Sequence, residues 1–294
     1  MTKIERIQKL VSLTEAYIIY SQATKLPFVV CDSETFFDCA YFFENKSDAQ
    51  KKADEICANG DQVGVATLTI SEMKNVLDGE TGKTIDNLQK NEVREHLMRL
   101  PMMGLNGVVF KPADEKETIL ELDQIFPTKV NNFIKEELKK ANVADLRLTG
   151  IFFAQELRKE NKNLEKLATC TEEFQANMIR SELFLPVMAS KDDIVKDYID
   201  PAKCQLPCYQ MRKKDSDELA KFLAVFTNMD EVDAHCRHNQ VNVQVVHLPY
   251  AEIYKIIMND PSIAGVVVDH FTINIPVSRE NVPKLVKALT GEKK

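Results

Sequence analysis

Four hydrophobic segments occur in the same order in both halves of this 294-residue chain, and this repeat constrains the fold more than any other sequence feature. The matching pairs are residues 27–30 and 182–189, 41–48 and 224–231, 63–68 and 243–248, and 107–110 and 265–268. Because the chain exceeds the usual size of one domain, two tandem copies of a domain are expected. We predict a first domain at residues 1–127, a helical linker at 128–162 and a second domain at 163–294.

The spacing of apolar residues predicts alternating helices and strands. In the second half, strands are expected at residues 182–189, 221–226, 241–248, 264–268 and 271–275, with helices around 164–178, 227–235, 251–257 and 282–286. In the first half, a helix at residues 4–11 is expected before the strand at 27–30. Thr227 or Asn228 could cap the helix that follows it. Each copy is therefore predicted to have an α/β (α+β) fold, with a mixed sheet of about four or five strands and flanking helices.

Two polar segments interrupt the repeat, at about residues 78–99 in the first half and 191–216 in the second. Surface connections tolerate such insertions because the entropic cost of closing a loop grows slowly with its length. We expect both insertions to lie outside the hydrophobic cores.

The composition excludes several classes of protein. Apolar residues make up 44% and charged residues 28%, a balance typical of folded globular proteins rather than disordered ones. The formal net charge of −7 disfavours nonspecific binding to nucleic acid or to an anionic membrane surface. Neither a signal peptide nor a run of about 18 apolar residues is evident. Seven cysteines, an odd number, fit reduced thiols, so we expect a cytoplasmic protein.

The order of the predicted strands, together with residues 226–232, 243–248 and 264–268, resembles the N-terminal domain of the SseB family. The resemblance covers residues 183–289 best and residues 27–122 more weakly. It implies a bacterial cytosolic α/β domain and brings no catalytic motif. The second half looks like another copy of the N-terminal type, where a distinct C-terminal domain would be expected in that family.

Cysteines and histidines in the second half could bind a metal ion. Cys204 and Cys208 lie four residues apart, and His235, Cys236 and His238 cluster on a later segment. Zinc sites use about four such ligands and often include a close pair of cysteines. The alternative is that the two groups lie in different elements, with His235 and His238 on a solvated helix face.

Asp269 and His270 could together orient a general base, but adjacent strand residues point to opposite faces, so a turn is the alternative interpretation. His247 is expected to be a structural histidine of a strand. The nine glycines form no phosphate-binding loop, so no cofactor is predicted and no catalytic residue is assigned.

Three classes of function remain open. The leading hypothesis is a noncatalytic binding or regulatory protein that presents a surface or an interdomain groove to a protein partner. The alternative is an enzyme, such as a hydrolase or a sulfur-handling accessory protein, that uses Cys204, Cys208 or His270 in the cleft between the copies. A third class is a dimerisation module; the sequence leaves the oligomeric state open.

Overall fold

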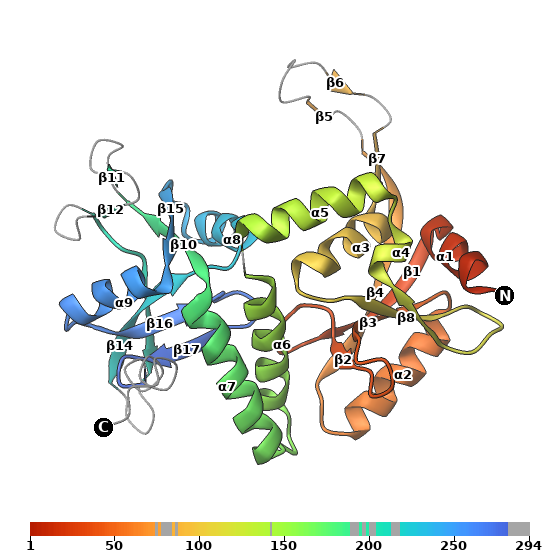
Figure 1. Cartoon of the computed structure of the whole chain (residues 1–294), viewed down its shortest axis with the longest axis horizontal. Coiled ribbons are helices and arrows are strands. Elements are labelled where there is room, and N and C mark those ends of the chain that lie inside the picture. The colour runs from red at the N-terminus through yellow and green to blue at the C-terminus, as the bar shows by residue number, and fades with distance from the viewer. Residues whose placement is uncertain are drawn as a thin grey trace. The chain divides into compact units, whose positions relative to one another are not determined.

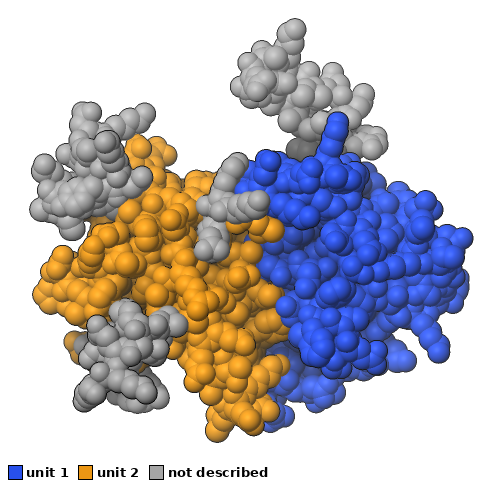
Figure 2. Space-filling view, viewed as in Figure 1, with its two compact units in different colours: residues 1–137, 159–161 blue, residues 138–158, 162–294 orange. Residues whose placement is uncertain are grey.

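The computed structural model describes residues 1–73, 76–77, 84–85, 88–141, 143–188, 194–195, 198–199, 204–212 and 218–281 (Figure 1). The chain divides into two compact units (Figure 2). Unit 1 comprises residues 1–137 and 159–161, and unit 2 comprises residues 138–158 and 162–294. Both combine helices with mixed sheets, which confirms the predicted α/β class. No helix among the described residues combines the length and the apolarity needed to cross a lipid bilayer.

Unit 1 is built around one large mixed sheet, and two of its short strands pair separately. Its elements are α1 (Lys3–Ser12), β1 (Glu15–Ser21), β2 (Val29–Cys31), β3 (Asp38–Phe43), α2 (Lys46–Ala58), β4 (Val63–Met73), β5 (Val76–Leu77), β6 (Thr84–Ile85), β7 (Leu88–Asn91), α3 (Glu92–Met102), β8 (Gly107–Lys111), β9 (Thr118–Glu121), α4 (Leu122–Ile125) and most of α5 (Thr128–Ala141). The strand order is β7-β4-β1-β3-β8-β9, and β2 pairs with β3. Strands β3 and β8 are parallel, whereas the other pairs in this sheet are antiparallel.

Helices α2 and α3 cover opposite faces of this sheet. Phe43 packs in a hydrophobic cluster with Ala49 and Ala53 of α2. The neighbouring Phe42 instead contacts the ring of His96 on α3, with 5.5 Å between the ring centroids. Adjacent residues of a strand point to opposite faces, so the two helices enclose the sheet between them.

Unit 2 also combines helices with parallel and antiparallel strand pairs. Its elements are α6 (Ala144–Arg158), α7 (Leu164–Arg180), β10 (Glu182–Val187), β11 (Ile194–Val195), β12 (Tyr198–Ile199), β13 (Cys208–Arg212), β14 (Leu219–Val225), α8 (Met229–Asn239), β15 (Gln244–Pro249), α9 (Tyr250–Asn259), β16 (Ile263–Val268) and β17 (Ile275–Ser278). Strands β13, β14, β16 and β17 form one sheet, and β10 pairs with β15. An antiparallel bridge between Phe184 and Phe226 joins β10 to the end of β14.

The order of strand pairings is the same in both units. In unit 1 the path runs β4-β1-β3-β8-β9, and in unit 2 it runs β15-β10-β14-β16-β17 once the bridge is included. In each path the third and fourth strands are parallel. One prediction about the repeat is therefore wrong. The sequence predicts that residues 27–30 correspond to residues 182–189, which contain β10. In the structure, β1 is the strand of unit 1 that occupies the place of β10 in the path. The predicted strand at 27–30 corresponds to β2, which pairs with β3 as β13 pairs with β14.

The other predicted elements of both halves are present, with two exceptions. The predicted strand at 271–275 is wrong, because residues 269–273 form a turn and β17 begins only at Ile275. Asp269 and Asn274 adopt left-handed backbone angles, with φ of 44° and 45°, which an extended strand cannot accommodate. The predicted helix at 282–286 lies outside the described residues.

The two insertions are shorter than the sequence suggested. Residues 92–99 belong to α3, where Val93 and Leu97 are buried in the core. Residues 208–212 form β13, which is paired with β14, and Cys204 is also buried. The expectation that both insertions lie outside the cores is therefore wrong for α3 and for Cys204, whereas the residues of β13 are exposed or partly buried.

Candidate functional site

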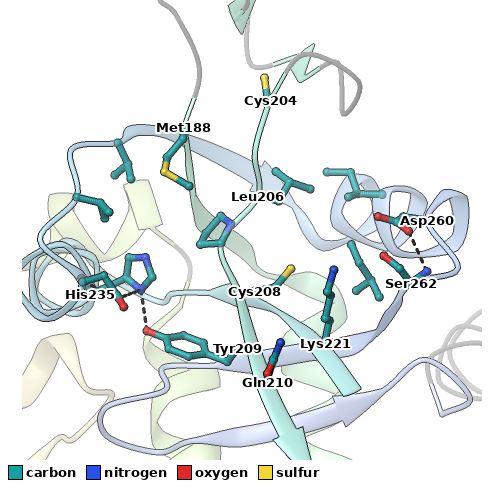
Figure 3. Close-up of a pocket in the computed structure, with 16 residues that line it drawn as sticks. Met188, Cys204, Leu206, Cys208, Tyr209, Gln210, Lys221, His235, Asp260 and Ser262 are labelled. Carbon is teal, nitrogen blue, oxygen red and sulfur yellow. Dashed lines mark hydrogen bonds between the residues drawn. The ribbon is translucent and has the colours of Figure 1, made fainter. Parts of the chain in front are cut away.

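The segment at residues 204–208 is held between the ends of two strands of unit 2. Met188 and Gln205 exchange two backbone hydrogen bonds of 3.0 Å, and the carbonyl of Pro207 accepts a 3.0 Å hydrogen bond from the amide of Ala224. This segment therefore leads from the end of β10 onto the edge of β14. A pocket of about 610 Å³ surrounds it (Figure 3), a size typical of pockets that bind small ligands or single anchoring side chains.

Apolar side chains form much of the wall of this pocket. They are Met188, Leu206, Pro207, Val241, Val243, Ile256 and Ile263. Figure 3 shows Cys208 in the middle, with His235 and Tyr209 to one side and Asp260 and Ser262 to the other. The pocket thus combines an apolar surface with polar groups on two sides, an arrangement that can bind an apolar group and orient it.

Lys221 is the cation beside Asp260 and Cys208. It is exposed, and the described part of the chain places no carboxylate within ion-pair distance of its ammonium group. The amide of Ser262 donates a 2.9 Å hydrogen bond to Asp260. Hydrogen bonds from Ser262 lower the pKa of Asp260, assisted by the charge of Lys221. Because Asp260 is already stabilised by Ser262, the ammonium group of Lys221 is available to an anionic group of a ligand.

Tyr209 and His235 form the other polar side. The hydroxyl of Tyr209 lies 2.7 Å from Nδ1 of His235, and the side chain of Asn239 lies 3.2 Å from the same nitrogen. His235 is buried, and this burial lowers its pKa, with smaller contributions from His270 and His238. His235 is therefore a neutral hydrogen-bonding group at neutral pH rather than a charged one.

The rings of His270 and Tyr209 stack with 3.8 Å between their centroids. His238 in turn contacts the ring of Phe271 at 5.3 Å. Three of the five histidines of the chain thus lie in one aromatic cluster next to the pocket.

Three of the predicted metal ligands, Cys204, Cys208 and His235, line the same pocket, whereas Cys236 and His238 do not line it. Cys204 is buried, Cys208 lies on β13, and His235, Cys236 and His238 are on α8. No group of three or more histidine, cysteine or acidic side chains within the described residues is arranged to hold a metal ion. His238 is on the solvated face, as expected, but that expectation is wrong for His235, because its ring packs against Tyr209 and Phe226.

Asp269 and His270 lie in a turn, as the alternative interpretation predicted. The side chain of Asp269 is buried and accepts hydrogen bonds from Thr227, whereas His270 stacks on Tyr209. The two side chains therefore engage different elements. His247 stacks on Phe184 of β10 with 4.5 Å between the ring centroids, consistent with a structural role.

Two thiols, those of Cys204 and Cys208, line the pocket, and Cys208 belongs to β13. Partial burial raises its pKa, so the thiol is protonated at neutral pH. It makes no hydrogen bond to any of the five histidines, all of which are described. A thiol nucleophile reacts as the thiolate, which requires a neighbouring base or cation to lower its pKa. The charge of Lys221 acts in that direction, but burial is the larger effect.

Sequence reasoning missed Tyr209, Lys221 and Glu231. Tyr209 and Lys221 occur in strands that pair across 12 residues of sequence, and their shared position depends on that pairing. Glu231 is a buried acid in the first turn of α8. Acidic residues are common in the first turn of a helix, so its sequence position gave no sign of burial.

No curated protein sequence matches this chain. Among solved structures, Tic22 from Plasmodium falciparum is 10% identical with a TM-score of 0.20, and the match covers 98% of this chain and 99% of that one. Anabaena Tic22 (protein transport) is 12% identical with a TM-score of 0.20, covering 100% of this chain and 99% of that one. A TM-score of 0.20 is too low to establish a common fold. At the level of sequence, residues 161–283 match the family of the SseB protein N-terminal domain, which confirms the predicted resemblance for this part of the chain.

Proposed function

We propose that this chain is a noncatalytic binding protein, and that its second unit recognises a segment of another protein at the pocket around Cys208. The observation that carries the proposal is the composition of the pocket, in which an apolar wall lies beside an exposed cation, Lys221. An apolar side chain of the partner would fill the pocket, and a carboxylate next to it would meet Lys221. Such an anchoring side chain, desolvated in a pocket, is the usual source of most binding energy.

The state of the polar groups supports binding over catalysis. The thiol of Cys208 is protonated, and His235 is occupied by hydrogen bonds to Tyr209 and Asn239. Each group can donate a hydrogen bond to a ligand or accept one from it. None is paired as a nucleophile with its base, which is the arrangement that covalent catalysis requires.

A pair of matched variants tests this proposal. Leu206 is a partly buried leucine of the pocket wall, and Leu164 is a 77% exposed leucine of α7 that does not line the pocket. Glutamate in place of Leu206 puts a charged group on the apolar wall, where an apolar side chain of the partner would have to displace its water. This change would weaken a complex by more than tenfold, given a cost of about 2 kcal/mol or more for desolvating such a group. Leu164→Glu makes the same chemical change on an open surface.

The two variants and the unchanged protein are tagged, expressed in the host of the chain and captured with their partners. We expect the same partner with the unchanged protein and with Leu164→Glu, and its loss with Leu206→Glu. Circular dichroism of both variants checks that unit 2 remains folded. Equal capture by both variants would place the binding surface elsewhere and refute the proposal.

We also propose that the two units are diverged tandem copies of one domain, located in the cytoplasm. The identical order of strand pairings supports a common origin, as do α2 and α8, which follow corresponding strands. The cytoplasmic location is supported by the odd number of cysteines. Labelling the thiols in intact cells with a membrane-permeant and an impermeant reagent tests the location.

A further inference from the structure

The turn at residues 269–274 is attached to α8 through a buried carboxyl group. Asp269 is 1% exposed, and both of its carboxyl oxygens are occupied by Thr227. The amide of Thr227 donates a 2.8 Å hydrogen bond to Oδ1, and the hydroxyl of Thr227 donates a 2.5 Å hydrogen bond to Oδ2. In this position Asp269 adopts a left-handed backbone conformation with φ of 44°, which is unfavourable for most residues other than glycine. The carboxyl group therefore fixes the start of the turn to the segment that leads into α8.

A second buried carboxyl group holds the same turn. Glu231 is 5% exposed and lies in the first turn of α8, which is capped by Asn228. The hydroxyl of Thr272 donates a 2.7 Å hydrogen bond to Oε1 of Glu231. The other oxygen, Oε2, is buried and has no hydrogen-bond partner among the described residues. Glu231 is thus less well compensated than Asp269, although both are removed from water.

The charged groups around this pair do not compensate for two negative charges. Arg147 on α6 acts on both carboxyl groups and favours their ionised forms, but it forms no ion pair within 4 Å with either of them in the described part of the chain. Asp230, next to Glu231 on α8, acts in the opposite direction. Arg158 on α6 donates hydrogen bonds to the carbonyls at residues 273 and 274 of the turn.

Two imidazoles also lie close to the pair in sequence. His270 follows Asp269, and His235 lies one helical turn after Glu231. Both have lowered pKa values because of their burial. They are therefore neutral at neutral pH and add no positive charge there.

We propose that Glu231 and Asp269 share a single proton in the folded protein, held on Glu231, and that loss of this proton releases the turn at residues 269–274 from α8. Burying two carboxylates that lack an ion-pair partner and act on each other's charge is more costly than keeping one of them neutral. Asp269 has two hydrogen-bond donors and Glu231 has one, so the ionised form is better stabilised at Asp269. Once both groups are charged, their repulsion acts across the contact between the turn and the helix.

The direction of the pH dependence follows from this arrangement. Burial, followed by the charge of Asp269, raises the pKa of Glu231 to about 7. The folded state therefore binds a proton that the opened state releases, and closure of the turn weakens as pH rises toward this value. Above this pH, protonation of Glu231 no longer contributes to closure of the turn. The contact between the turn and α8, which depends on the proton of Glu231, lies beside the aromatic cluster, because His270 belongs to the same turn.

Hydrogen exchange of the turn amides, corrected for the intrinsic effect of pH, tests the proposal in the full chain. Protection of the turn in the unchanged protein should fall about tenfold between about pH 6 and pH 8.5, because opening returns Glu231 to its ordinary pKa. The variant Glu231→Gln keeps the shape but cannot ionise, so its protection should be constant over this range. A turn in Glu231→Gln that loses protection as the unchanged protein does would overturn the proposal.

Glu156 provides the matched control. It is 4% exposed, but its Oε1 accepts a 2.6 Å hydrogen bond from the amide of Asn163 and its Oε2 lies 3.5 Å from Lys166. Glu156→Gln should leave the pH dependence of the turn unchanged. If Glu231→Gln does not fold, infrared spectra of the unchanged protein decide the matter. The band of a protonated carboxyl group should disappear reversibly between about pH 6 and pH 8.5, and its absence at the lower pH would refute proton sharing.

Discussion

Acid should destabilise unit 1 through His96, a histidine that is enclosed between α3 and the central sheet. Its ring contacts Phe42, and its Nε2 atom is buried without a hydrogen-bond partner among the described residues. Burial, with a smaller contribution from the charge of Arg99, lowers the pKa of His96 from 6.5 to about 4. The folded state thus favours the neutral ring. Its contribution to stability is fully present above the unfolded pKa of 6.5, and it is lost as pH falls from there to about 4.

The size of this effect follows from the two pKa values. Their difference corresponds to about 3 kcal/mol of unfolding free energy over the whole range, of which about 2 kcal/mol is lost between pH 7 and pH 5. The variant His96→Leu fills the same apolar position without a titrating group. It should be at least as stable as the unchanged protein at pH 7 and should lack this part of the loss on acidification.

Urea denaturation of the unchanged protein, His96→Leu and His238→Leu at these two pH values measures the difference. His238 is exposed on α8, so its replacement is the matched control and should not alter the pH dependence of unit 1. The signal should come from unit 1 alone, for example from hydrogen exchange of amides in α3, because two units can unfold separately. An equal loss of stability on acidification in the unchanged protein and in His96→Leu would refute the reasoning.

Three further substitutions test the packing and the helix start of the units. Gly265→Ala places a Cβ atom against the backbone carbonyl oxygen of Val277, closer than the two atoms can approach. It should therefore break the pairing of β16 with β17 and destabilise unit 2 by several kcal/mol, measured by thermal unfolding. In Gly64→Ala the nearest atom belongs to the side chain of Tyr20, which can move, so a smaller loss is expected and an equal loss would contradict the argument. Asn228→Ala removes the cap that accepts a hydrogen bond from the amide of residue 231, and should cost about 1 kcal/mol in urea denaturation. No change would show that water replaces the cap.

The sequence predicted the helices and strands whose apolar residues follow a regular period. It failed at β1 because the buried positions of Glu15–Ser21 do not alternate, and a strand that is enclosed on both faces lacks a clear period of two. It also failed at residues 271–275, where Phe271, Ile273 and Ile275 do alternate. There, the hydrogen bonds of Asp269 with Thr227, 42 residues away, fix a turn instead.

The candidate site was only partly predictable for the same physical reason. Cys208 and His235 are candidate ligands because of their residue types alone, and both line the pocket. Their environment depends on contacts between distant segments, such as the hydrogen bond between Tyr209 and His235, 26 residues apart. Burial of Glu231 likewise depends on Thr272 in the turn. No local pattern encodes these contacts.

Site-specific photo-crosslinking in living cells tests the central claim, partner binding at the pocket of unit 2, most directly. A photoreactive amino acid replaces Leu206 in one strain and Leu164 in another, and the crosslinked peptides are identified by mass spectrometry. The account predicts one recurrent segment of another protein, with an apolar residue next to an acidic one, crosslinked at position 206 and not at position 164. Crosslinks that are absent at position 206, or that are the same at both positions, would contradict it.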